Sequence, residues 1–112
     1  MDIRKSGTNL KLLLTGETYD AIYVGVQIAN ADQQLRLCAD LGVESIPCWQ
    51  VLVQADPANG QTNVLVGNEH QGCHIVLRPG ESITVPVNDV GKVYVRTVEG
   101  GGNTTVNWLA VT

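Results

Sequence analysis

The stretch "CHIVLRPGESITVPVNDVGKVYVR" (residues 73–96) decides the fold. Apolar and polar residues alternate through most of it, and period-two alternation predicts β-strands because successive side chains of a strand point to opposite faces. The alternation stops at "RPGE", where Pro79 fixes φ at one turn position and Gly80 can take the positive φ needed at the next. It stops again at "VND". The stretch therefore predicts three strands joined by turns, and Pro86 predicts an edge position or a bulge for the second strand.

The same alternation continues on both sides of this stretch. Further strands are predicted in "AIYVGVQIAN" (21–30), "QQLRLC" (33–38), "PCWQVLVQA" (47–55), "NVLVG" (63–67) and "TVNWLAV" (105–111). Asp-Pro and Asn-Gly in "ADPANGQT" and the glycines of "EGGGN" favour turns between them. In the first of these strands four aliphatic residues share one parity: Ile22, Val24, Val26 and Ile28. A helix over residues 30–42 is an alternative, because Leu35, Cys38 and Leu41 lie three apart.

About eight closely spaced strands and no convincing helix predict an all-β protein. The expected architecture is a single β-sandwich of the jelly-roll or immunoglobulin-like type, or a small barrel. We expect this domain to span residues 21–112. Residues 1–20 break the alternation and are predicted to form an N-terminal arm or an extra edge strand. Four leucines of this arm are predicted to contact a partner or a neighbouring subunit: Leu10, Leu12, Leu13 and Leu14.

The composition argues against several classes of function. The 112-residue chain has a formal net charge of −4 and no basic face, so we predict no nucleic-acid partner. No apolar run approaches the roughly 20 residues that span a bilayer, and none near the N-terminus is long enough for a signal peptide. We therefore predict synthesis in the cytoplasm and no membrane partner. Phe is absent, which predicts a core of Val, Leu and Ile, and three widely spaced cysteines argue against a disulfide framework.

No residue pattern predicts catalysis or a cofactor. Cys73 and His74 are adjacent, so they should point to opposite faces of a strand and cannot easily bind one metal ion. The acidic residues lie mostly in turns and not as an inward-facing pair. Trp49 and Trp108 could stack on a sugar, although such residues more often fill a core or an interface rim. We therefore expect a protein with no enzymatic activity and no bound metal or cofactor.

From about Ala29 to the C-terminus, the order of motifs resembles that of a family of small structural proteins of tailed bacteriophages. The resemblance is carried by "IPCWQVLVQADPANG" (46–60), "NVLVG", "IVLRPGESITVPVNDVGKVYVR" (75–96) and "TVNWLAV". It implies a non-enzymatic virion protein that decorates and stabilises the head by binding the outer surface of the major capsid protein. It also implies a homotrimer, made in the host cytoplasm and located in the virion. On this reading the arm leucines contact the capsid or a neighbouring subunit.

Other functions remain open at this point. The same domain could serve as a connector or a tail-associated virion protein. A carbohydrate-binding β-sandwich module would expose Trp49 or Trp108 for stacking. A small hydrolase or isomerase on a jelly roll would bring titratable groups together in a pocket.

Overall fold

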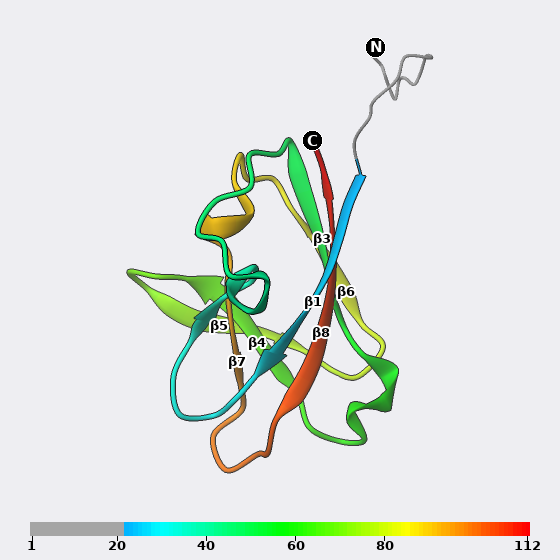
Figure 1. The fold of residues 1–112 in the computed structure, drawn as a ribbon. Coiled ribbons are helices and arrows are strands. Elements are labelled where there is room, and N and C mark those ends of the chain that lie inside the picture. The colour runs from blue at the N-terminus through cyan, green and yellow to red at the C-terminus, as the bar shows by residue number, and fades with distance from the viewer. Residues whose placement is uncertain (1–21) are drawn as a thin grey trace.

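A computed structural model describes residues 22–112 and shows an all-β protein (Figure 1). The strands are β1 (Ile22–Ala29), β2 (Leu35–Arg36), β3 (Gln50–Ala55), β4 (Val64–Asn68), β5 (Gly72–Leu77), β6 (Ser82–Val85), β7 (Tyr94–Thr97) and β8 (Thr104–Val111). Three single-turn 3-10 helices lie in the loops: η1 (Ala39–Leu41), η2 (Pro57–Asn59) and η3 (Val90–Lys92). The predicted arm (residues 1–20) and Ala21 lie outside the described residues.

The eight strands form two four-stranded antiparallel sheets that pack as a β-sandwich. The strand order is β1-β8-β3-β6 in one sheet and β2-β7-β4-β5 in the other. Thus β1 pairs with β8, β2 with β7, β3 with β6 and β4 with β5. The chain is therefore one long hairpin, with its tip between β4 and β5, that folds over on itself. This nesting is the jelly-roll arrangement, so the structure decides between the two sandwich types that the sequence left open.

Several local predictions are confirmed and one alternative is wrong. Gly80 has a φ of 91°, and the Glu81 N–H donates to the Arg78 carbonyl at 2.9 Å, as expected of the turn before β6. The strand β6 lies at a sheet edge and ends just before Pro86. The helical alternative for residues 30–42 is wrong, because this segment holds the two-residue strand β2 and only the single turn η1. Of the three residues with this spacing, only Cys38 is buried in the core, whereas Leu41 is exposed.

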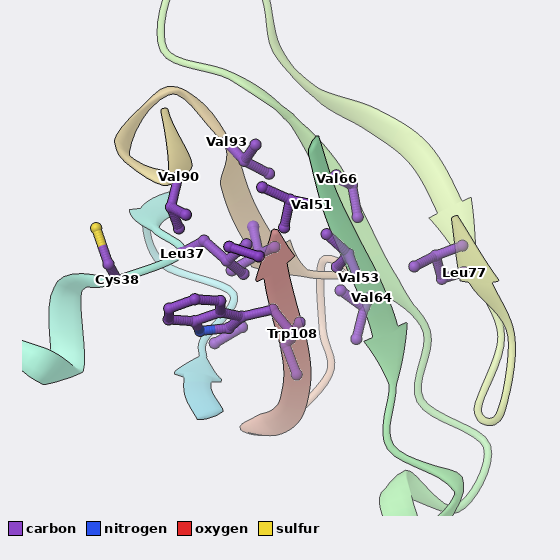
Figure 2. Close-up of a cluster of buried hydrophobic side chains, with 14 of the residues drawn as sticks. Leu37, Cys38, Val51, Val53, Val64, Val66, Leu77, Val90, Val93 and Trp108 are labelled. Carbon is purple, nitrogen blue, oxygen red and sulfur yellow. The ribbon is translucent and has the colours of Figure 1, made fainter. Parts of the chain in front are cut away.

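The core between the sheets is aliphatic, as the absence of Phe predicts. Its largest fully buried side chains are Leu37, Val51, Val53, Val64, Val90, Val93, Val95 and Val106, and Figure 2 shows part of this cluster around Trp108. The Trp108 ring stacks on Tyr23 with the ring centroids 6.0 Å apart. A Cβ at Gly25 would overlap the indole of Trp108. Glycine at position 25 therefore allows β1 to lie directly against this ring.

Candidate interaction surface

The solvent side of the β1-β8-β3-β6 sheet carries a group of aliphatic side chains. We call it the aliphatic face, and it consists of Ile22, Val24, Val26 and Ile28 of β1, Leu109 and Val111 of β8, and Leu52 of β3. Directly opposite residues of neighbouring strands share a face, and the register aligns Val24, Leu109 and Leu52 in one row across three strands. Val24 is 65 % exposed. Aliphatic side chains grouped in this way on a surface typically mark an interaction site.

The strand β1 presents its apolar side to solvent and its polar side to the interior. Gln27 is fully buried. Its side-chain Oε1 accepts a hydrogen bond from the Asp40 N–H at 2.8 Å, and its Nε2 donates to the Ile28 carbonyl at 3.0 Å. These bonds satisfy the buried amide, as burial of a polar group requires. Gly25, against Trp108, and the buried Gln27 thus define the inward side of β1. The four aliphatic residues of the strand therefore face outward.

Among residues 22–112, nothing pairs with most of the outer edge of β1. The Ile28 N–H donates to the Asp40 carboxylate at 2.9 Å, on the side away from β8. In an antiparallel strand, residues of one parity direct both backbone groups to the same side. Ile22, Val24 and Val26 therefore point their N–H and C=O groups away from β8 as well. No strand within residues 22–112 pairs with this edge, so it can accept an added strand.

The other half of the same sheet face is polar. Asn107 donates its side-chain N–H groups to Gln54 Oε1 at 3.1 Å and to the Asp56 carboxylate at 3.0 Å. The Ala58 N–H, and then the Asn107 amide, hold the pKa of Asp56 below its usual value. Toward β6, Ser82 and Thr84 are exposed. The sheet face is therefore divided into the aliphatic face, which follows β1 and the adjoining parts of β8 and β3, and a hydrogen-bonded polar part.

A groove of about 720 Å³ lies between the β4–β5 hairpin and the segment from β6 to β7. Its walls include the aliphatic side chains Val66, Ile75, Ile83 and Val93, with His70 and Lys92 among the polar residues. The volume is in the range of small-ligand sites. Lys92 is exposed and donates to Asn88 Oδ1 at 2.9 Å. The lining also includes Glu69, and no hydrogen bond joins its carboxylate to His70 or Lys92.

The three cysteines have environments typical of unreactive thiols. Each cysteine is free, and burial raises the pKa of Cys38 and of Cys48. Burial raises the pKa of Cys73 to about 11, against a smaller lowering effect of Arg96. A thiol with a raised pKa is a poor nucleophile at neutral pH because the thiolate is the reactive form.

The predicted separation of Cys73 and His74 is confirmed. Cys73 is buried, while His74 is exposed and its Nε2 lies 2.7 Å from the Gln71 carbonyl. Within residues 22–112 no group of three His, Cys, Asp or Glu side chains is placed to hold a metal ion.

Asp89 is the most heavily hydrogen-bonded carboxylate in the described part of the chain. It accepts bonds from the Ser45 hydroxyl, from the Ile46 N–H at 3.0 Å and from the Gly91 N–H at 2.8 Å. Burial on its own would raise the pKa of Asp89, but these bonds outweigh it and hold the pKa below its usual value. The carboxylate thus joins the loop before β3 to η3, which is a structural role.

The two tryptophans have different environments. Trp49 is 76 % exposed, whereas Trp108 is 2 % exposed and belongs to the core. Trp108 is therefore excluded as a platform for sugar stacking, and the carbohydrate-binding alternative depends on Trp49. The predicted contact residues Leu10, Leu12, Leu13 and Leu14 lie outside the described residues, so their role stays a prediction.

The aliphatic face could not be assigned from the sequence pattern alone. A strand pattern shows that alternate residues share a side, but it does not show which side faces the core. In β1, Gln27 has the opposite parity to the four aliphatic residues. Because a polar residue normally faces solvent, the sequence favours the reverse orientation of this strand. The face becomes visible only when β1 is placed beside β8.

Helix length and comparison with known proteins were considered next. The helices within residues 22–112 are single turns, and none is long enough to cross a membrane. No protein-family model, curated protein or solved structure matches the chain.

Proposed function

We propose that the protein is a non-enzymatic bacteriophage structural protein that decorates and stabilises the head by binding the outer surface of the major capsid protein. The attachment surface is the aliphatic face. The observation that carries this proposal is that four aliphatic side chains of β1 face solvent while its glutamine is buried. A protein that acts by binding another protein needs such a surface and no catalytic centre.

The environments of the titratable groups support a binding function over catalysis. The described thiols with resolved pKa shifts are protonated at neutral pH. Asp89 and Asp56 are engaged in hydrogen bonds within loops. Jelly rolls occur in viral capsid proteins and in lectins, which is compatible with the proposal, although a fold by itself does not establish a function.

We also propose a homotrimer on the capsid. Three copies related by a closed threefold axis would present three aliphatic faces to a shell of matching symmetry. Weak contacts of the three copies would then add through their effective concentration. The net charge of −4 would limit adhesion to packaged DNA by like-charge repulsion.

The decisive experiment measures binding to purified phage heads that lack the protein. We compare the wild-type chain with Val24→Asp and Leu109→Asp, which place a charge in the aliphatic face. Ser82→Asp is the matched control, because Ser82 lies opposite Gln54, so it adds the same charge to the polar part of the same sheet face. We expect each of the first two variants to weaken binding by about tenfold or more, since central contacts in an interface often contribute about 2 kcal/mol or more, and the control to bind as wild type. Unchanged binding of Val24→Asp and Leu109→Asp, with cooperative melts retained, would refute the proposal.

A carbohydrate-binding module is the second candidate, because Trp49 is largely exposed. An indole on the surface can stack on the apolar side of a sugar ring. Titration of Trp fluorescence with a panel of soluble oligosaccharides tests this function. A saturable change that disappears in Trp49→Ala would favour it over head decoration.

A further inference from the structure

We propose that the groove between the β4–β5 hairpin and the segment from β6 to β7 binds an extended peptide segment of a partner protein. The segment adds to the free edge of β6 as a short strand and inserts two aliphatic side chains into the groove. The groove shares no residue with the aliphatic face, so binding here does not depend on the proposed function. Three features of the described residues support strand addition: an uncovered inner side chain, the direction of the β6 backbone groups and the side-chain pattern that this direction imposes.

The first feature is an aliphatic residue that faces the interior of the sandwich without being covered. Ile75 of β5 lies directly opposite Val66 of β4, and directly opposite residues share a face of the sheet. Val66 is 3 % exposed, whereas Ile75 is 51 % exposed. Both side chains line the groove. Within residues 22–112, the space beside Ile75 is therefore open to another apolar group.

The wall of the groove that β6 provides is aliphatic as well. Ile83 and Val85 line it, and both are partly buried against the core. Removing apolar surface from water is favourable by roughly 25 cal/mol for each Å². Apolar side chains placed between Ile75 and these two residues would therefore be held by the hydrophobic effect.

The second feature is the direction of the backbone groups of β6. The Ala55 N–H donates to the Glu81 carbonyl at 3.0 Å, so the odd-numbered residues of this segment direct their backbone groups toward β3. Residues of the other parity in an antiparallel strand direct theirs to the opposite side. Ser82 and Thr84 therefore point their N–H and C=O groups away from β3. No strand in the described part of the chain pairs with that side of β6.

These backbone groups determine the kind of occupant. A row of N–H and C=O groups at a sheet edge is satisfied by another strand, whereas a lipid chain or an aromatic molecule in the groove would leave it unpaired. The outer edge of β1 has such a row too, but only β6 lies beside a groove that can bury the side chains of an added strand. Pro86 has no N–H and ends the row, so the edge suits a short segment.

The third feature is the side-chain pattern that this edge requires. A residue of the added strand opposite Thr84 exchanges hydrogen bonds with it, and its side chain lies on the outer face, where Thr84 is exposed. The residues before and after it stand opposite Ile83 and Val85, which pair with the buried residues Val53 and Val51. Those two side chains therefore point inward, into the groove. The recognised segment is thus extended and reads aliphatic, polar, aliphatic.

Titration of the full-length, isotope-labelled protein with synthetic peptides, followed by NMR, tests the proposal. The probe is a blocked peptide with two valines separated by one threonine, flanked by threonine and then by lysine for solubility. One control peptide has the same composition with the two valines adjacent. A second control carries an N-methyl group on the threonine between the valines, which removes the N–H that the Thr84 carbonyl would accept.

We expect the probe to shift the amide signals of Ser82 and Thr84 in a saturable way. Both control peptides should bind about tenfold more weakly or worse, because each loses a backbone hydrogen bond or the inward position of a valine. Equal affinities of the three peptides would refute strand addition, since the groove would then bind apolar groups without regard to the backbone. The absence of saturable shifts with all three would overturn the proposal as well.

Ile75→Asp and Val76→Asp give a matched pair of protein variants. The two residues are neighbours in β5 and are 51 % and 52 % exposed, but only Ile75 lines the groove. Ile75→Asp should weaken binding of the probe by about tenfold or more, and Val76→Asp should change it by less than about twofold. Cooperative melts verify that both variants fold. Equal binding by the two variants would place the peptide elsewhere on the surface and refute the proposed site.

Sedimentation of the same two variants identifies the source of the segment. A segment supplied by a partner protein predicts that both variants associate with themselves to the same extent as wild type. Loss of self-association in Ile75→Asp alone would make a second copy of the chain the occupant of the groove, and would overturn the assignment to a partner.

Discussion

Replacing Gly25 by alanine should destabilise the protein strongly, although it adds only one methyl group to an edge strand. A Cβ at this position would come within 2.9 Å of Trp108 Nε1 and closer still to Cζ2 and Cε2 of the same ring. Carbon atoms in contact normally lie about 3.5–4.0 Å apart. Either β1 or the indole must therefore move by roughly 1 Å.

The movement is costly because the ring is buried among core side chains. Trp108 is 2 % exposed and lies within the core cluster, whose close packing transmits a displacement to its neighbours. Overpacking of a core costs about 1–3 kcal/mol and occasionally more. We expect the upper part of this range, about 3 kcal/mol, which is a large share of the roughly 5–15 kcal/mol typical of a domain.

Urea unfolding followed by circular dichroism measures this free energy. Gly102→Ala is the control, because a Cβ there meets no atom within 4 Å, and it should leave stability nearly unchanged. Trp108→Phe in the Gly25→Ala background should recover part of the loss, since the smaller ring removes the atoms in collision. Equal midpoints for Gly25→Ala and Gly102→Ala, or strict additivity of the double variant, would show that the overlap is not the cause.

Four further predictions address the turns, the thiols, the acid sensitivity and the assembly. Gly80→Val should lower the free energy of unfolding by about 1 kcal/mol or more, because its φ of 91° is unfavourable for a β-branched residue, and an unchanged urea midpoint would contradict this. Cys73, with a pKa raised to about 11 by burial, should react with iodoacetamide at pH 8 far more slowly in the folded protein than in urea, and equal rates would refute its inertness. The folded-state pKa of Asp89 is lowered below its ordinary value of 3.8. The carboxylate therefore stabilises the fold above that value, and this contribution is lost as pH falls through the folded-state pKa. The urea midpoints of Asp89→Asn should thus depend less on pH below about 4 than those of wild type. Sedimentation at micromolar concentration, with and without heads, should show a trimer, and a monomer under both conditions would exclude the proposed assembly.

The local elements were predictable because their causes are local. The turn at Gly80 needs only a proline followed by a glycine, and the edge position of β6 follows from the missing N–H of Pro86. Alternation predicted strands at the positions of β3, β5 and β8. The segment around Leu35 was harder, because a two-residue strand and a single helical turn are too short to establish any period.

The order of the strands and the orientation of β1 were not predictable. Pairing of β1 with β8 joins Ile22 to Val111, and nothing in either strand alone specifies the other as its partner. The inward position of Gln27 depends on the Asp40 N–H, which the fold brings to it from a loop. The aliphatic face lies on the side of the sheet that Gln27 points away from. It could therefore not be assigned before this long-range contact was known.

The nested hairpin has a consequence for synthesis of the chain. Residues near β4 and β5 can pair as soon as they leave the ribosome, but β1 must wait for β8, the most C-terminal of the described strands. Until then none of the strands within residues 22–112 pairs with β1, and its aliphatic residues are open to chaperones. Such long-range pairing also slows folding, because the chain must close its largest loop before the contact is formed. A chain that stops before Thr104 cannot present Val24, Leu109 and Leu52 in one row, so only copies translated through β8 acquire the surface that we assign to attachment.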